Sequence, residues 1–254
     1  MLELAGTRVI DIHAHLGASW IGQTDFTDFT PADLVAGYDR FGVEKACVSS
    51  WQILYEPKQG NVEICQAVQQ FPDRLMGFCV VSPRQPGALE EVENCTTKQG
   101  MKGIKLHPSQ GKWKADSRLV DPIIDFAQSK RIPVLMHTWS DDHSHPTRVG
   151  NLAKRFPRAT IIMAHMSADA WLEAIEVAAD HDALLLDTAV HYNQYQVLKT
   201  AVEKLGSERI LFGSDFPEMN LGAELAKIVY AQISDRDKKR ILGENAAELL
   251  GISK

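Results

Sequence analysis

Short apolar runs and longer segments of helical period alternate along this chain of 254 residues. The short runs are rich in β-branched residues, as buried strands are, and turn-forming residues bound them. The longer segments repeat apolar positions every three to four residues, which is the period of an amphipathic helix. Strands that alternate with helices in this way predict a parallel sheet covered by helices.

The pattern predicts eight strands, which lie within residues 8–17, 45–50, 75–81, 103–106, 133–136, 160–164, 183–187 and 209–212. Helices are predicted at residues 30–41, 61–71, 88–99, 119–130, 148–156, 168–180 and 194–205, with two more at 222–233 and 235–250. No linker rich in Pro, Gly or Ser interrupts the series. We therefore predict one domain over residues 1–254, a (β/α)8 TIM barrel with an extra C-terminal helix.

Composition narrows the class of protein. The formal net charge of -6 and the pI near 5.8 disfavour a general nucleic-acid binder. The four cysteines lack Cys-x-x-Cys spacing and lie in apolar runs, which is typical of reduced thiols in a cytoplasmic protein. No secretory signal is expected at the start of the chain, and no apolar run approaches a membrane span. We expect no nucleic-acid or membrane partner, and the sequence leaves a homo-oligomer open.

Two histidines in the first predicted strand suggest a metal site. His13 and His15 are two residues apart, so in a strand both imidazoles point to one face, which Asp11 should share. Zinc takes nitrogen ligands at about 2.0 to 2.1 Å, and two imidazoles on one strand supply half of a four-ligand shell. The alternative is a pair of histidines near a turn that bond only to backbone groups.

The ends of the other predicted strands carry further ligands. In an eight-stranded parallel barrel, the chemistry lies in the loops at the carboxyl ends of the strands. Side chains able to bind a metal stand there after the first, fourth, fifth, sixth and eighth strands: His13, His15, His107, His137, His165 and Asp215. Because they should all face one rim, the sequence predicts a metal site at the mouth of the barrel.

The motifs around these residues resemble those of the amidohydrolase superfamily, and within it the amidohydrolase-2 type. They are Asp-Ile-His13-Ala-His15, Gly103-Ile-Lys105-Leu-His107-Pro108, Met136-His137, Ala164-His165, Gly213-Ser-Asp215-Phe-Pro217 and the closing Ile241-Leu-Gly-Glu-Asn245-Ala-Ala-Glu-Leu-Leu250. The likeness spans the whole chain in the family's order. It does not specify a substrate.

The resemblance implies roles for the rim residues. It implies that His13, His15, His137 and Asp215 bind one divalent ion, with Zn²⁺ expected, and that water or substrate fills an open position. It also implies that Asp215 and His165 move protons, work that suits an imidazole near neutral pH. The alternatives are a turn carboxylate for Asp215 and a core histidine for His165.

Lys105 and His107 leave the number of metal ions open. In two-metal members of the superfamily, a strand-four lysine is carbamylated and bridges the ions, and the histidines of strands five and six, here His137 and His165, bind the second ion. Lys105 stands at about that place, and an ordinary lysine paired with Asp11 or another carboxylate is the alternative. His107 can contact substrate or serve as another ligand.

Four tryptophans and two arginines are weaker candidates for binding substrate. Trp20, Trp51, Trp113 and Trp139 follow predicted strands; in the pocket they would indicate a flat or apolar substrate, although they can merely cap the barrel. Arg84 and Arg148 are positioned to receive a carboxylate, and surface ion pairs explain them equally well. His143 and His145 repeat the His-x-His spacing within a polar segment, and a solvated loop is expected there.

The expected function is a metal-dependent hydrolase that uses metal-bound water on a small amide, lactone or ester-like substrate. The alternative is a metal-dependent, non-oxidative decarboxylase of an aromatic or unsaturated carboxylic acid, which would use the same ligands. A deoxyribonuclease of the same superfamily is disfavoured by the acidic charge. A binding barrel without catalysis is disfavoured because the ligand set is complete.

Overall fold

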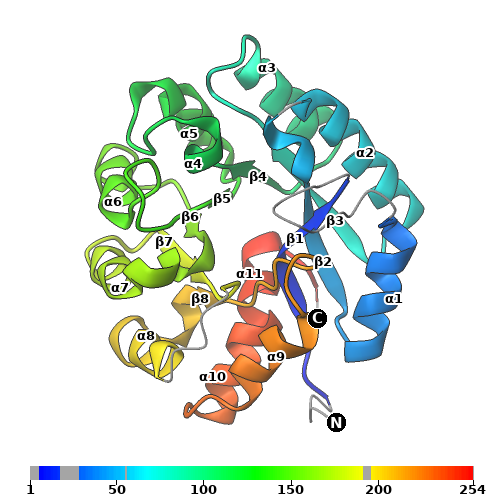
Figure 1. Cartoon of the computed structure of the whole chain (residues 1–254), viewed down its shortest axis with the longest axis vertical. Coiled ribbons are helices and arrows are strands. Elements are labelled where there is room, and N and C mark those ends of the chain that lie inside the picture. The colour runs from blue at the N-terminus through cyan, green and yellow to red at the C-terminus, as the bar shows by residue number, and fades with distance from the viewer. Residues whose placement is uncertain (1–5, 18–28, 55, 191–195, 254) are drawn as a thin grey trace.

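The computed structural model describes residues 6–17, 29–54, 56–190 and 196–253. Eight strands form one sheet in sequence order, and each is parallel to the next. They are β1 (Ile10–Leu16), β2 (Lys45–Ser50), β3 (Leu75–Val80), β4 (Gly103–Leu106), β5 (Val134–Met136), β6 (Ile161–Met163), β7 (Leu184–Asp187) and β8 (Ile210–Leu211). The segment after β8 bridges to Ala14 of β1, and the amide of Ile12 donates to the carbonyl of Phe212 (2.9 Å), so the cylinder closes (Figure 1). The predicted TIM barrel is confirmed.

Helices surround the cylinder. They are α1 (Pro31–Phe41), α2 (Pro57–Gln70), α3 (Ala88–Glu93), α4 (Pro108–Gly111), α5 (Asp121–Lys130), α6 (Pro146–Arg155), α7 (Trp171–Ala179), α8 (Val197–Leu205), α9 (Leu221–Val229), α10 (Asp235–Lys239) and α11 (Asn245–Leu250). Short 3₁₀ or π segments lie at η1 (Trp51–Leu54), η2 (Asn94–Lys98), η3 (Arg118–Val120), η4 (Ala164–Ala170), η5 (Ser207–Arg209) and η6 (Arg240–Glu244). No helix of the described residues is both long and apolar enough to span a bilayer.

Helix boundaries follow local chemistry. Thr30 caps α1 through a capping box with Asp33, and Pro31 occupies the first turn. The long helix expected at 235–250 is instead α10, a π segment and α11. The helix expected from residue 168 begins only at Trp171, because residues 165–168 have positive φ.

Two apolar layers hold the barrel together. Alternate strand residues face outward and pack with the helices, where Leu34 and Ile123 are fully buried. Inward-facing residues fill the lower part of the cylinder: Ile10, Ile12, Cys47, Phe78, Leu135, Ile162, Ala164 and Leu211. Ala246 and Ala247 of α11 join this inner cluster, so the extra C-terminal helix closes the end of the barrel opposite the mouth.

A bulge in β1 changes which residues point inward. The pairing of β1 with β2 shifts register between Asp11 and Ala14, where β1 carries one extra residue. Ile10 and Ile12 therefore face inward, but Ala14 belongs to the outer layer. Asp11 consequently does not share the face of the two histidines, as the simple alternation predicted. It lies against α1, where the hydroxyl of Tyr38 donates to its carboxylate (2.9 Å).

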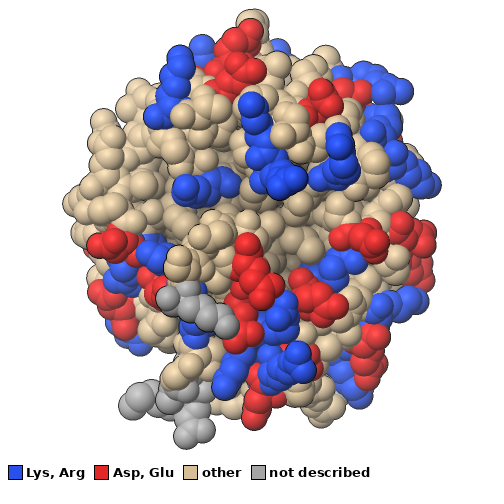
Figure 2. Space-filling model, turned by 180° about the vertical axis from the view of Figure 1, so that it is seen from behind, with Lys and Arg blue, Asp and Glu red and all other residues tan. Residues whose placement is uncertain are grey.

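Charge is unevenly spread over the surface. On the face seen in Figure 2, a band of Lys and Arg crosses the upper middle of the view among Asp and Glu side chains. The net negative charge of the sequence therefore does not extend as a uniform field over that face.

Candidate active site

A cavity of about 370 Å³ opens at the carboxyl ends of the strands. It is lined by His13, His15, Trp51, Lys105, His107, Ser109, Gln110, His137, Trp139, Asp141, His165, Asp215, Glu218 and Met219. The loops after β1, β2, β4, β5, β6 and β8 all contribute. The six predicted rim residues therefore lie in one cavity, as the strand-end argument required.

Three of the predicted metal ligands form a tight cluster on the cavity floor. The Nε2 atoms of His13 and His15 are 3.2 Å apart, and Oδ1 of Asp215 lies 3.4 Å from the first and 2.9 Å from the second. Donors about 2 Å from a common ion have separations of this size. Among the described residues, His13, His15 and Asp215 form one group able to hold an ion, and His13, His165 and Asp187 form another.

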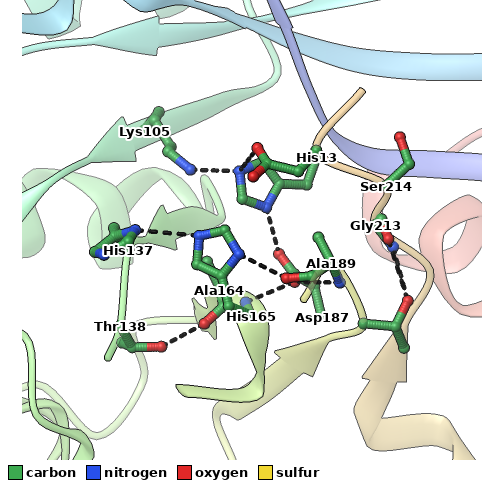
Figure 3. A network of polar contacts seen from close by, with 12 residues as sticks. His13, Lys105, His137, Thr138, Ala164, His165, Asp187, Ala189, Gly213 and Ser214 are labelled. Carbon is green, nitrogen blue, oxygen red and sulfur yellow. Dashed lines mark hydrogen bonds and ion pairs between the residues drawn. The ribbon is translucent and has the colours of Figure 1, made fainter. Parts of the chain in front are cut away.

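Hydrogen bonds on the far side of each imidazole fix its tautomer. Nδ1 of His13 donates to Oδ2 of Asp187 (2.8 Å), and Nδ1 of His15 donates to the carbonyl of Ser49 (3.3 Å). Nδ1 of His165 donates to the carbonyl of Ala189 (2.6 Å), as Figure 3 shows. Each ring is therefore left with the Nε2 lone pair toward the cavity, the arrangement typical of histidines that bind a metal.

These tautomers leave acceptor atoms facing one another. Neither Nε2 of His15 nor that of His13 carries a proton to give, and Oδ1 of Asp215 is buried without a hydrogen-bond donor. Burial opposes ionisation of Asp215, but positive charge at this cluster, such as that of a protonated His13 or His15, outweighs burial and holds the pKa of the carboxyl well below its usual range. Burial likewise lowers the pKa of both histidines. Two imidazole lone pairs and a carboxylate oxygen therefore face one another, and this arrangement suits a bound cation.

The loop after β8 is shaped to bring Asp215 to this cluster. A Cβ at Gly213 would lie 2.9 Å from Cβ of His13, so only glycine allows this approach. Ser214 anchors the loop, because its amide donates to Oδ1 of Asp11 (3.0 Å) and its hydroxyl donates to Oδ2. Asp215 has φ of 56°, in the left-handed region, and its amide donates to the carbonyl of His13 (2.7 Å). Asp11 is thus a structural anchor for the Gly-Ser-Asp turn.

His137 and His165 meet on another wall of the cavity. Nδ1 of His137 lies 3.1 Å from Nε2 of His165, and the ring of His137 stacks on that of His107 at 3.7 Å. Burial lowers the pKa of His165 to about 4. His137 lies outside both three-residue groups, so its role as a metal ligand stays a prediction.

Lys105 is buried and lies at the cluster. Its Nζ is 2.6 Å from Nε2 of His13, and it makes no ion pair with Asp11, whose carboxylate is occupied by Tyr38 and Ser214. Burial lowers the pKa of Lys105 to about 8, against the charges of Asp215, Asp187 and Glu218. His107 differs from the other histidines, because its Nδ1 accepts from the amide of Gln110 (3.3 Å) and its Nε2 therefore carries the proton.

The weaker substrate-binding candidates separate into two sets. Trp51 lines the cavity and stacks on His15 at 3.8 Å, and Trp139 lines it parallel to the ring of His137. Trp113 is buried in the outer core instead, because it packs beneath Gly111, and Trp20 lies outside the described residues.

The two arginines do not line the cavity. Arg84 donates to the carbonyl of Lys112 (2.6 Å), and Arg148 pairs with Asp116 and Asp142. The ion-pair interpretation therefore describes Arg148, whereas Arg84 bonds to a backbone carbonyl. The loop histidines are likewise used locally, because Nδ1 of His145 caps α6 through the amide of Thr147.

Two carboxylates of the site were not predicted from the sequence. Asp187 ends β7, and its Oδ1 accepts from the amides of His165 (2.8 Å) and Ala189 (3.1 Å) while Oδ2 holds His13. Its position at a strand end was the available signal. Glu218 lines the cavity three residues after Asp215, and burial and the charge of Asp215 raise its pKa to about 7.

Comparison with known proteins gives several relatives whose names are those of decarboxylases. The chain is 22% identical over 250 residues to gamma-resorcylate decarboxylase of Polaromonas sp., covering 78% of this chain and 76% of that protein. The solved 2,6-dihydroxybenzoate decarboxylase from Rhizobium aligns with a TM-score of 0.79 and 16% identity, covering 97% of this chain and 99% of that one. A dihydroxybenzoic acid decarboxylase from Polaromonas sp., solved with bound manganese and the inhibitor 2-nitroresorcinol, aligns with a TM-score of 0.80 and 17% identity over 98% of both chains.

These names correct the expected function. The motifs led us to expect a hydrolase, but these relatives are decarboxylases, so the hydrolase expectation is wrong. The motifs could not separate the two, because both reactions use the same ligands. The manganese in a neighbour also leaves zinc unconfirmed. The family model for amidohydrolases of type 2 matches residues 10–252, and this chain is therefore an enzyme of the amidohydrolase family.

Proposed function

We propose that this protein is a metal-dependent, non-oxidative decarboxylase of a one-ring aromatic carboxylic acid. The observation that carries the proposal is a cluster of facing acceptor atoms, on His13, His15 and Asp215, in a cavity walled by Trp51 and Trp139. A cation at the acceptors attracts a carboxylate, and flat aromatic walls suit a planar ring. The names of the three relatives support the same reaction.

We infer that His13, His15 and Asp215 hold one divalent ion and that His137 supplies a fourth donor. Zn²⁺ suits two or three nitrogens with one carboxylate, and Mn²⁺, present in a neighbour, is the other candidate. When bound, the ion orients the substrate carboxylate and stabilises negative charge that develops during the reaction. We favour one ion over two, because Nζ of Lys105 directly contacts His13 and would have to leave to bridge a second.

Lys105 and His107 are suited to binding the substrate. The Lys105 ammonium is a buried cation beside the acceptor cluster, so it can share the substrate carboxylate with the ion. His107 has its Nε2 proton free for a ring hydroxyl or carboxylate, because its Nδ1 is occupied by the amide of Gln110.

Decarboxylation exchanges the carboxylate for a proton. A ring carbon gains a proton, its bond to the carboxylate breaks, and carbon dioxide leaves while the bonding electrons stay on the ring. We assign the proton transfer to Nε2 of His165, which is next to Nδ1 of His137. Because burial lowers its pKa to about 4, the ring is neutral at rest, and it must take up a proton from the cavity before it can pass that proton to the ring carbon. Asp215, on the same floor, is the second group able to pass the proton on.

The test is release of carbon dioxide from the purified protein. Elemental analysis should find about one Zn²⁺ or Mn²⁺ per chain. The loaded protein should then release carbon dioxide from at least one member of a panel that includes 2,6-dihydroxybenzoate, 2-hydroxybenzoate and 4-hydroxybenzoate. His137→Ala and His165→Asn should each suppress release, and only the first should also lose metal. Full metal content without carbon dioxide from any hydroxybenzoate would refute the proposal.

A further inference from the structure

The charged side chains that line the cavity are biased in sign. Among the residues described, Lys105 is the only Lys or Arg in the lining, whereas Asp141 and Glu218 add two carboxylates to that of Asp215. Residues 18–28 and 191–195, outside the described part, contain no Lys or Arg in their sequence. A substrate carboxylate is therefore attracted to one place in the cavity, formed by Lys105 and the ion that the neighbouring acceptor cluster would bind.

Asp141 is a fixed negative charge at the rim. Its Oδ2 accepts from the hydroxyls of Ser109 and Ser144, both at 2.6 Å, and its Oδ1 accepts from the amide of His143 (2.8 Å). Burial opposes ionisation, but these hydrogen bonds outweigh it and lower the pKa of Asp141 to about 2. The carboxylate is thus ionised at any working pH.

Glu218 differs from Asp141 in being free to bind a ligand. Its backbone is fixed, because its amide donates to the carbonyl of Asp215 (3.0 Å). Its half-buried carboxyl group reaches the cavity near enough to Lys105 for their charges to interact. No donor among the described residues bonds to this carboxyl group, so its acceptor capacity is available to a molecule in the cavity.

We propose that Glu218, aided by Asp141, selects an aromatic acid with a single carboxylate, and that Glu218 accepts a hydrogen bond from a ring hydroxyl. This inference rests on the proposed function for the position of the first carboxylate, at the ion and Lys105. A second carboxylate on the ring would meet Glu218 or Asp141 in a partly buried cavity, where like charges repel more strongly than in water. A hydroxyl at the same ring position would donate to Glu218. Rejection of dicarboxylates is then an active feature of the site.

Binding of matched acids, each first shown to release no carbon dioxide under the conditions of the measurement, tests this selectivity. Benzoate, 3-hydroxybenzoate and isophthalate differ only at one ring position, and 4-hydroxybenzoate and terephthalate repeat the comparison at the next. Dissociation constants would be measured by calorimetry on metal-loaded protein at pH 8. At least one hydroxybenzoate should bind more tightly than benzoate, and both dicarboxylates should bind about tenfold or more weakly than benzoate.

Two variants and a control separate charge from shape. Glu218→Gln removes the charge but keeps the size, so the dicarboxylates should gain about tenfold relative to benzoate. Glu218→Lys should make a dicarboxylate the preferred ligand. Glu176→Gln removes an equal charge from an exposed position on α7 and should leave every ratio unchanged. Metal content and circular dichroism of each variant exclude a folding defect.

Two results would overturn the proposal: dicarboxylates binding the unmodified protein as well as benzoate, or Glu218→Gln leaving the ratios unaltered. Carbon dioxide release is scored separately. If the ratios follow expectation but no hydroxybenzoate is decarboxylated, the proposed reaction fails and the selectivity stands. If carbon dioxide is released but the binding ratios do not depend on Glu218, the selectivity proposal fails and the proposed reaction stands.

Discussion

The two ends of the barrel interior use the same strands and hold opposite kinds of side chain. At the closed end, strand residues such as Ile12, Phe78 and Leu211 form one apolar cluster with Ala246 and Ala247 of α11. At the open end, the same or neighbouring strands present His13, Lys105 and the other polar residues of the cavity. At both ends these residues are almost fully buried, including His13 and Lys105. The difference therefore lies in what replaces water, apolar contacts at one end and hydrogen bonds or charge at the other.

This division assigns stability and chemistry to different ends. Apolar burial stabilises the fold by about 25 cal/mol per Å² removed from water, and the closed end supplies such surface. Buried polar groups at the open end cost free energy unless each has a partner. Strained backbone accompanies them, because His165 and Asp215 both have positive φ. The open end is tolerated because the closed end and the outer layer hold the strands in place.

Asp215→Asn should produce the largest change. The variant keeps the shape but removes the charge that faces His13 and His15, so bound metal should be lost and turnover should fall by about a thousandfold or more. Thermal unfolding of the metal-free protein should change little, because Oδ1 has no hydrogen-bond donor to lose. Elemental analysis measures the bound metal, and calorimetry measures thermal unfolding of the metal-free protein. Retention of the ion with full turnover would show that Asp215 does not belong to the metal site.

Phe78→Ala tests the closed end. Phe78 is completely buried in the inner cluster, and its ring covers Gly103, so the substitution should lower the free energy of unfolding by about 3–5 kcal/mol. Metal content per folded molecule should not change. Denaturant unfolding measures the first quantity and elemental analysis the second. A variant that loses its ion while its stability is unchanged would contradict the division between the two ends.

Asp187→Asn tests the support behind the cluster. Asp187 holds Nδ1 of His13 with one oxygen and the amides of His165 and Ala189 with the other, so an amide cannot satisfy every donor. Loss of such a partner typically reduces metal affinity or activity by about 10–100-fold. Titration of the metal-free protein with Zn²⁺ and Mn²⁺ measures the change. Asp182→Asn, at an exposed position just before β7, is the matched control and should bind metal normally.

The sequence predicted the barrel and the place of its cavity well, because hydrophobic period and position at strand ends determine both. The alternation of strands and helices defined the barrel, and the rule that chemistry follows strand ends gathered His13, His107, His137 and Asp215 into one cavity. The orientation of single side chains was less accessible. Asp11 was expected beside the two histidines, but the bulge in β1 turns it toward α1. The position of a bulge depends on how two strands pair, and the sequence of one strand does not reveal that pairing.

The sequence pattern also could not show which loop side chains line the cavity and which bond to neighbours or pack in the core instead. Arg148 and Trp113 stand after predicted strands as much as Trp139 does, yet Arg148 pairs with Asp116 and Trp113 packs in the outer core. Which loop residue turns into the cavity depends on partners elsewhere in the chain. The choice between hydrolase and decarboxylase was inaccessible for a different reason, because the same ligands serve both reactions.

The smallest effect is the contribution of the buried histidines of the open end to the pH dependence of stability. Burial lowers the pKa of His165 to about 4, against about 6.5 in an unfolded chain, and also lowers that of His13, His15, His107 and His137. Between these two values the unfolded chain takes up protons that the folded protein cannot, so stability is present above pH 6.5 and is lost as pH falls toward 4. Each such histidine contributes a slope of up to about 1.4 kcal/mol per pH unit. Buried carboxyl groups whose pKa is raised to about 7, those of Asp11, Glu218 and Glu224, act with the opposite sign, so the histidine contribution is measured by difference. In denaturant unfolding of EDTA-treated protein at several pH values, His165→Gln should reduce the slope between pH 4 and 6.5 by about one proton relative to the unmodified protein. The Phe78→Ala variant should shift the whole curve downward without changing its slope, since the closed end has nothing to protonate in this range among the residues of its inner cluster.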